Sequence, residues 1–373
     1  MDVYQELARH LDDLPGGFPP TESGVELRIL RRLFTPEEAE LALHLSLIPE
    51  EARVIAHRAR IAPQETARRL DEMAKKGLIY SIESQNRPPK YMALQYVIGI
   101  WEFHLNDLDP DLIRDMEEYI PALMDEVWKV PQLRTIPVGR SIDADLTVLP
   151  YEKAEELLRG REKFLVAPCI CRRERRMVGE GCDRPVESCL VFGEGSGLYE
   201  RNGLGRMIDQ REALDILKRA DEAGLVLQPG NSKNPSNICT CCGCCCGVLR
   251  NLKLQPKPAS LVSSPFVAAA DADTCAGCGT CIDRCQMDAL SLEDGTISLD
   301  LDRCIGCGLC VGTCPTGSLT LVRKPDFEQP QVPRNIIEFS IRLARARGKL
   351  GLADMVRMPL RSVIDRAVVT IKR

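Results

Sequence analysis

The sequence predicts an α+β protein with a helical N-terminal domain, a cysteine-rich middle domain, and a C-terminal domain of short strands that ends in a helical tail. Helical periodicity dominates the first 130 residues, and all eighteen cysteines lie after residue 168. The length of 373 residues also exceeds that of one ordinary domain. We therefore expect four parts, at residues 1–130, 140–255, 265–325 and 331–373.

Within the N-terminal domain, residues 26–98 follow the order of three helices and a hairpin. Thr35-Pro36-Glu37-Glu38 has the pattern of a capping box, with proline at the first helical position. We expect the helices and strands at residues 35–47, 50–58, 63–76, 78–82 and 90–94. This order resembles a winged helix.

The winged-helix resemblance implies DNA binding through the third helix, and a docking or dimerisation module is the alternative. The cations of that helix are Arg68, Arg69 and Lys75. Three acidic side chains, Glu65, Asp71 and Glu72, share the same helix, and phosphate binding requires a face of net positive charge. The mixed charge argues against DNA as a partner.

The middle of the chain is predicted to alternate helices and strands. A stretch containing Pro and Gly, Val130–Gly139, marks the expected boundary after the helical part, whose last long helix is expected over 111–127. A shorter helix is expected over 151–159. Asp209 is a predicted cap for a helix that ends before Gly224, and the strand Leu225–Leu227 follows it.

The cysteines are expected to be metal ligands. The N-terminus lacks a basic segment followed by an apolar one, so no secretory signal is predicted, and we expect a cytoplasmic protein. Clustered thiols stay reduced in that compartment. The longest apolar run, Tyr91–Phe103, is too short to span a membrane.

Two segments near the C-terminus repeat one cysteine spacing. Cys275-x-x-Cys278-x-x-Cys281-x-x-x-Cys285 is followed by Cys304-x-x-Cys307-x-x-Cys310-x-x-x-Cys314-Pro315. Three cysteines at this spacing wrap one side of a [4Fe–4S] cube, and interspersed glycines permit the tight loop. The doubled spacing favours a pair of clusters over zinc ribbons.

Residues 270–322 closely resemble the bacterial two-cluster ferredoxins, which implies a ferredoxin fold with two [4Fe–4S] clusters. In that family the last cysteine of each run binds the other cluster. The resemblance implies a first cluster on Cys275, Cys278, Cys281 and Cys314, and a second on Cys304, Cys307, Cys310 and Cys285. A departure is Gln286, which stands where a proline often follows the cysteine.

Ten further cysteines precede this module and are candidate ligands of one or two additional iron–sulfur clusters, with zinc or unmetallated thiols as alternatives. They are Cys169, Cys171, Cys182, Cys189, Cys239, Cys241, Cys242, Cys244, Cys245 and Cys246. Neighbouring side chains of an extended chain point to opposite faces, so the six thiols of 239–246 cannot share one ion. Arginines at 172, 173, 175 and 176 could offset the charge of a thiolate cluster.

Residues 165–322 also resemble a loosely related set of proteins from anaerobes, and that resemblance implies iron–sulfur electron transfer without naming a reaction. The shared features are a Cys-Ile-Cys-Arg segment, a helix ending in Glu-Ala-Gly-Leu-Val and a Cys-Cys-x-Cys-Cys-Cys-Gly segment before the two-cluster module. The widely spaced Cys-Cys-Gly pattern of heterodisulfide reductases is absent from the sequence.

The sequence offers no nucleotide or acid–base signature. Gly193-x-Gly195-x-Gly197 lacks the spacing of a dinucleotide loop, and all four histidines precede the cysteines. We therefore expect an electron-transfer protein, or the electron-transfer subunit of an oxidoreductase and not its catalytic subunit. Its electron donor and acceptor are expected to be separate proteins. A redox-responsive winged-helix regulator is the alternative.

The C-terminal segment 331–373 is expected to be a basic amphipathic tail. It carries ten Lys or Arg and three acidic residues, a net charge of +7, in a chain whose net charge is -5. Its run of apolar residues near 336–343 is unsuited to a free tail, so docking on a protein or on an anionic membrane surface is expected.

Overall fold

The computed structural model describes residues 2–84, 86–349 and 352–371. It divides into two compact units. Unit 1 comprises Met1–Val130, Arg201–Leu204 and Ser340–Arg373, and unit 2 comprises Pro131–Glu200 and Gly205–Phe339. Helices and strands are both abundant, which confirms the predicted α+β class.

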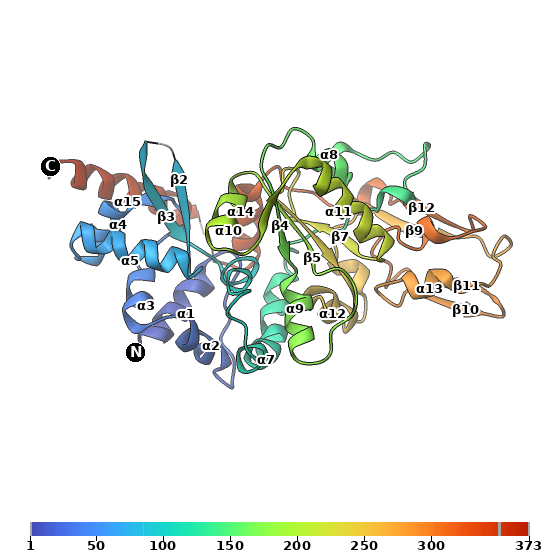
Figure 1. Cartoon of the computed structure of the whole chain (residues 1–373), viewed down its shortest axis with the longest axis horizontal. Helices are drawn as coiled ribbons and strands as arrows, with labels where there is room; N and C mark the ends of the chain where they lie inside the picture. The colour runs from blue at the N-terminus through green and yellow to red at the C-terminus, as the bar shows by residue number, and fades with distance from the viewer. Residues whose placement is uncertain (1, 85, 350–351, 372–373) are drawn as a thin grey trace. The chain divides into compact units, whose positions relative to one another are not determined.

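Unit 1 is mainly helical (Figure 1). Its strands are β1 (Glu50–Glu51), β2 (Ile79–Ser84) and β3 (Arg87–Ala93). Its helices before the tail are α1 (Val3–Asp13), α2 (Val25–Leu33), α3 (Pro36–Ala42), α4 (Ala52–Ala59), α5 (Pro63–Lys75), α6 (Trp101–Phe103) and α7 (Pro110–Val127).

The helices and hairpin predicted over 35–94 are present in the predicted order. The capping box forms, because the Thr35 hydroxyl accepts from the Glu38 N–H at 3.3 Å and the Glu38 carboxylate accepts from the Thr35 N–H at 2.9 Å. Helix α3 is shorter than predicted and ends at Ala42, since the next residues form tighter turns. Strand β3 pairs antiparallel with β2 on one edge and β1 on the other.

Aromatic side chains form the centre of unit 1. The rings of Phe18, Tyr96 and Tyr119 are buried and meet pairwise, with centroids 4.9 to 5.9 Å apart. Such tilted and edge-on pairs add to the free energy gained from burial alone. They join the segment after α1 to the β3–α6 connection and to α7.

The C-terminal tail forms helices α14 (Ile336–Ala346) and α15 (Leu352–Ile371). From Ser340 on it is part of unit 1 and packs there through buried polar contacts. Arg347 pairs with Asp12 at 2.6 Å and with Glu126 at 2.8 Å, and the guanidinium is 1% exposed. Asp365 of α15 accepts from Arg58 of α4 at 2.5 Å. The tail is thus built into unit 1, and docking on a partner stays a prediction for its outer face alone.

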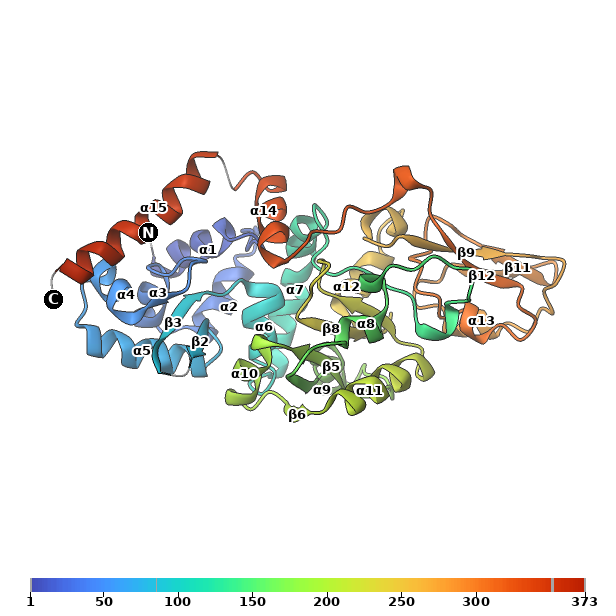
Figure 2. The same cartoon turned by 90° about the horizontal axis from the view of Figure 1, so that it is seen from above.

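Unit 2 contains a five-stranded antiparallel sheet in the order β6-β4-β5-β8-β7 (Figures 1 and 2). Its strands are β4 (Phe164–Pro168), β5 (Glu187–Phe192), β6 (Arg206–Ile208), β7 (Val226–Pro229) and β8 (Asn237–Cys241). The helices around it are α8 (Ala154–Leu158), α9 (Ile170–Met177), α10 (Glu194–Arg201), α11 (Gln210–Glu222) and α12 (Gly247–Lys253).

Helix α11 shows why the sheet has a stable core. Asp209 caps it by accepting from the Glu212 N–H at 2.7 Å, as predicted, and Gly224 at its end has a φ of 71°. Its buried stripe, which includes Ala213 and Leu217, packs on β4, β5 and β7. This packing holds the strands whose ends carry the middle cysteines.

Two antiparallel strand pairs and a short helix complete unit 2. They are β9 (Phe266–Ala270) with β12 (Leu319–Arg323), β10 (Leu290–Glu293) with β11 (Thr296–Leu299), and α13 (Thr280–Arg284). The β10–β11 hairpin has the predicted turn, with positive φ at Asp294 and Gly295. Asp221 of α11 joins this part to the sheet by ion pairs with Arg140 and Arg284.

Arg347→Met should lower the free energy of unfolding of unit 1 by about 3 kcal/mol, because it removes the buried cation from two carboxylates and leaves them only the more exposed Lys349 and Lys129. Arg347 also donates to the backbone carbonyls of Asp12 and Leu14 at 2.9 and 2.8 Å. Urea unfolding followed by far-UV circular dichroism measures the change. The control is Arg114→Ala, which removes an exposed ion pair with Asp111 and should cost under about 0.5 kcal/mol. Equal losses in the two variants would contradict a structural role for Arg347.

Candidate metal centres

None of the eighteen cysteines forms a disulfide bond in the structure, and all lie in unit 2. They form four sulfur groups. Site A comprises Cys275, Cys278, Cys281 and Cys314, and site B comprises Cys285, Cys304, Cys307 and Cys310. Site C comprises Cys182, Cys242, Cys244 and Cys245, and the sulfur row comprises Cys169, Cys171, Cys189, Cys239, Cys241 and Cys246.

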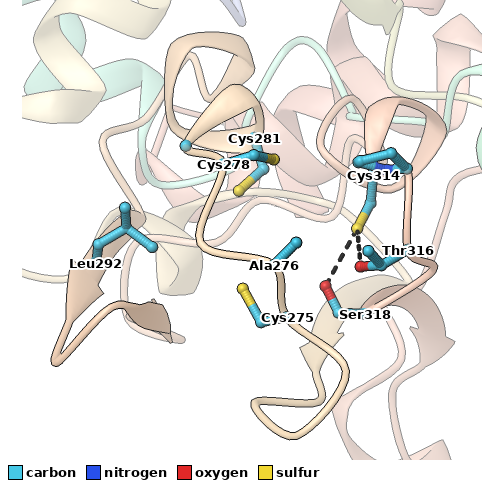
Figure 3. A pocket seen from close by; sticks show the side chains of 10 residues that line it. Cys275, Ala276, Cys278, Cys281, Leu292, Cys314, Thr316 and Ser318 are labelled. Carbon is cyan, nitrogen blue, oxygen red and sulfur yellow. Dashed lines mark hydrogen bonds between the residues drawn. The ribbon is translucent and has the colours of Figure 1, made fainter.

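Site A surrounds one small cavity (Figure 3). Three of its thiols come from the loop leading into α13 and from α13 itself, and Cys314 comes from the turn before β12. Leu292 and Gly279 also line the cavity. Thiols from both repeats therefore face a common space, which fits the expected ligand set of a four-iron cluster.

Hydroxyl groups surround the sulfur of Cys314 in site A. The Ser318 hydroxyl lies 3.1 Å from it and the Thr316 hydroxyl 3.6 Å. Burial raises the pKa of Cys314, but these hydrogen bonds outweigh burial and lower the pKa to about 6. The thiolate is the form that binds iron, so the local donors prepare this cysteine for ligation.

Site B is deeper in the protein than site A. Cys304 and Cys310 are buried, whereas Cys278 of site A is exposed. Burial, with the nearby charges of Cys304 and Cys285, raises the pKa of Cys310 to about 12. Four such thiols ionise together only when a positive group compensates their charge, as metal ions do.

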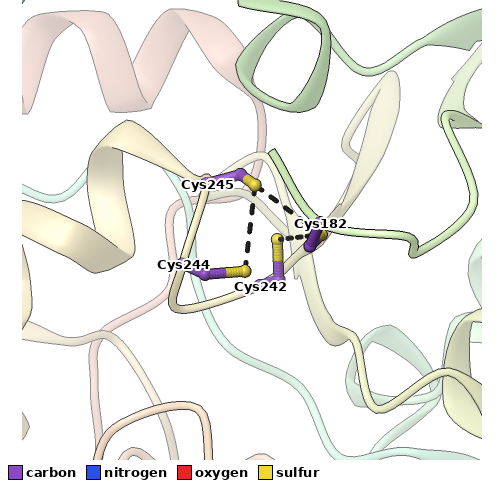
Figure 4. Close-up of side chains that lie close together, drawn as sticks. All are labelled: Cys182, Cys242, Cys244 and Cys245. Atoms are coloured by element: carbon purple, nitrogen blue, oxygen red, sulfur yellow. Dashed lines mark hydrogen bonds between the residues drawn. The ribbon is translucent and has the colours of Figure 1, made fainter. Parts of the chain in front are cut away.

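Site C brings four sulfurs into close contact (Figure 4). Their Sγ atoms all lie within 4.8 Å of one another. The contacts are 4.0 Å between Cys182 and Cys242, 3.6 Å between Cys182 and Cys245, and 3.8 Å between Cys244 and Cys245. Within the described residues this is the one group of three or more Cys, His or acidic side chains that meets so closely.

The sulfur row is a continuous line of side-chain contacts. It runs from Cys169 to Cys171, then to Cys246, Cys241, Cys239 and Cys189. The contacts between neighbouring thiols lower the pKa of Cys246 and Cys239 and raise the pKa of Cys241 between them. Because no three of its sulfurs gather within the limit that site C meets, a single ion cannot bind all six.

The six thiols of 239–246 divide between the two middle sites as the sequence argument requires. Cys241 at the end of β8 joins the sulfur row, and its neighbour Cys242 joins site C. Cys245 and Cys246 divide in the same way. Alternation of side chains separates Cys241 from Cys242 at the end of β8, whereas Cys244 and Cys245 lie in a turn and both face site C.

Arginine side chains lie against the middle sulfurs. Arg172 is fully buried, donates to the Thr240 carbonyl at 2.9 Å and lies 3.8 Å from the Cys242 sulfur. Burial lowers the pKa of Arg172, but the negative charges of Cys169 and Cys242 raise this pKa by more, so the guanidinium stays charged. Arg184, which the sequence analysis did not single out, lies 3.5 Å from the Cys244 sulfur. The predicted Arg175 instead pairs with Glu180.

Gln286 connects the C-terminal module to the middle cysteines. Its side chain is 6% exposed, and its Oε1 accepts from the Gly243 N–H at 2.8 Å. Gly243 lies between Cys242 and Cys244, and Gln286 follows Cys285 of site B. The residue that departs from the ferredoxin pattern thus forms a direct link between site B and the segment that carries site C and part of the sulfur row.

Residues 268–321 match the family model of the 4Fe-4S dicluster domain. Neither the curated proteins nor the solved structures compared with the chain gave a match. The described part of the chain has no helix long and apolar enough to cross a membrane. Together with the clustered cysteines, the family match supports an iron–sulfur module and a role in electron transfer.

Gly308→Ala should destabilise the module more than Gly279→Ala, although both glycines have a φ near 75° and hold equivalent places in the two repeats. A methyl group at 308 would overlap the Ser141 side chain, whereas one at 279 meets nothing within 4 Å. We expect a loss of about 1 kcal/mol for Gly279→Ala from the backbone alone, and at least about 2 kcal/mol for Gly308→Ala. Thermal unfolding of the anaerobic protein tests this.

Ser141→Gly provides the control for that comparison. In a Ser141→Gly background the overlapping side chain is absent, so Gly308→Ala should there cost no more than Gly279→Ala costs in the parent protein. A larger loss in that background would place the cost of Gly308→Ala inside the module and not in its packing against residues 139–141.

Proposed function

We propose that the chain is an electron-transfer protein, or the electron-transfer subunit of an oxidoreductase, that relays single electrons to a partner enzyme of anaerobic metabolism. Sites A and B are the proposed ligand sets of two [4Fe–4S] clusters, which when bound accept and release one electron each. The observation that carries this proposal is that each site combines three thiols of one repeat with the last thiol of the other, inside the segment that matches the dicluster family.

Sites A and B differ in exposure, which suits an electron-entry position at site A and an interior position at site B. Cys278 of site A is exposed, whereas Cys307 of site B is partly buried and its carbonyl accepts from the Val138 N–H at 3.0 Å. Solvent exposure and hydrogen bonds to sulfur set cluster potentials. Site A is therefore proposed to exchange electrons with an external partner, and site B with the interior.

The sulfur row is the proposed place of an additional iron–sulfur cluster. The row holds six thiols in successive contact, more than the four that one four-iron cube takes, so a larger cluster or two clusters would be needed to engage them all. The charge of Arg172 compensates part of the thiolate charge beside Cys169. The link from Gln286 to Gly243 gives site B a short covalent and hydrogen-bonded connection to this region.

The alternative of a DNA-binding regulator gains no support from the charges of α5. Arg68 pairs with Glu65 and Glu72 at 2.7 Å, and Arg69 pairs with Glu65 at the same distance. These guanidinium groups already serve intrahelical partners. A face without net positive charge lacks the counterion release that drives DNA binding.

Anaerobically purified protein should contain at least eight irons per chain, as two four-iron clusters require, and more when the sulfur row is loaded. Cys246→Ser should reduce only the excess above eight, because Cys246 belongs to the row. Iron and sulfide analysis with electron paramagnetic resonance of the reduced protein measures both quantities. An iron content of eight, unchanged in Cys246→Ser, would contradict the additional cluster.

Cys307→Ser should impair the cluster of site B and slow electron delivery to the partner by at least about tenfold, because it removes one of the four proposed ligands of that cluster. The partner enzyme supplied with an artificial reductant should keep its turnover, because fully ligated cubes carry electrons without binding substrate. Stopped-flow reduction kinetics measure the first effect and steady-state assays the second. Lost turnover with the artificial reductant, despite intact assembly of the complex, would show that this chain takes part in the chemistry.

A further inference from the structure

Site C has the dimensions of a site for a single ion. Zinc bound to four thiolates has Zn–S distances of about 2.3 Å, which places the sulfurs of a tetrahedron at about 3.8 Å from one another. The three contacts of site C are 3.6, 3.8 and 4.0 Å, and no pair exceeds 4.8 Å. A four-iron cube places an iron and bridging sulfides between its thiolates, so its four ligand sulfurs stand farther apart.

Sites A and B provide an internal comparison. Their cysteines have the spacing of cube ligands in sequence, and in the described residues neither site gathers three sulfurs within the 4.8 Å that site C meets. Site A instead encloses a cavity between its four thiols. The same protein thus contains open four-thiol sites and one closed four-thiol site.

We propose that Cys182, Cys242, Cys244 and Cys245 bind one tetrahedral zinc ion, and that site C is a structural metal site and not a third iron–sulfur cluster. Closed sets of four protein ligands are characteristic of structural zinc. This inference does not rest on the proposed electron transfer, since it follows from the geometry of site C alone.

The charges around site C suit such an ion. Zn²⁺ with four thiolates carries a net charge of −2, and two guanidinium groups reach the set, Arg172 at 3.8 Å from Cys242 and Arg184 at 3.5 Å from Cys244. Arg184 is itself held by the Ala223 carbonyl at 3.1 Å. Hydrogen bonds from outside the ligand set orient the ligands and stabilise their ionised form.

The site also explains how a loop is held in place. Three ligands come from the turn between β8 and α12, and Cys182 comes from the loop between α9 and β5. The Arg176 side chain also holds this loop, because it donates to the Cys182 carbonyl at 2.8 Å. A metal would cross-link the two segments and fix the turn that contains Gly243, the contact point of Gln286.

The test compares two exposed cysteines in the full-length protein, Cys244 of site C and Cys278 of site A. Protein purified anaerobically from medium with both metals is analysed for zinc and iron per chain. We expect about one zinc per chain in the parent protein. Cys244→Ser should lower the zinc content about fivefold or more and leave the iron content unchanged. Cys278→Ser should leave the zinc content unchanged and lower the iron content by about four per chain, the iron of one cluster.

Zinc-edge X-ray absorption of the parent protein provides a second measurement that needs no variant to fold. Four sulfur neighbours at about 2.3 Å without a metal neighbour would support the proposal. A loss of about four irons in Cys244→Ser, with zinc absent from the parent protein, would overturn the proposal and assign a cube to site C.

Discussion

The electrostatic repulsion between thiolates is the constraint on which unit 2 depends. Eighteen cysteine sulfurs lie in one unit, and most are at least partly buried. Burial and neighbouring thiolates raise the pKa of thiols such as Cys310, so several of them ionise together only when positive charge lies among the sulfurs. In the proposed metal sites, metal ions supply most of that charge, and Arg172 and Arg184 supply the part that the chain itself provides.

Features governed by neighbours in sequence were predictable. The capping box at Thr35, the cap of α11 at Asp209, the β10–β11 hairpin and the separation of Cys241 from Cys242 all depend on local spacing. The five-stranded sheet was largely missed, because its edge strand β6 spans three residues and β8 consists mainly of polar and cysteine residues. Such short strands form only through their partners, and local propensity does not reveal them.

The packing of the tail and the contacts of arginines with cysteine sulfurs were not predictable, because they join segments that are distant in the sequence. Arg347 was counted with the basic residues of an external docking surface, yet it is buried against Asp12 and Glu126, more than two hundred residues away. A positive charge in sequence carries no sign of whether water or a carboxylate will surround it. Arg184 was missed for the same reason, since its contact with Cys244 joins two loops that only the folded sheet brings together.

Gln286 shows how a departure from a family pattern acquires a physical explanation. A proline at this position offers no side-chain acceptor, whereas the glutamine amide oxygen accepts from the Gly243 N–H. Gly243 itself leaves room for the approach, because a methyl group there would overlap the Gln286 carbonyl. Glutamine at 286 in place of proline and glycine at 243 together make this contact possible. The C-terminal module is therefore adapted to the middle domain at the ligand of site B, the point where two metal-binding regions of the chain meet.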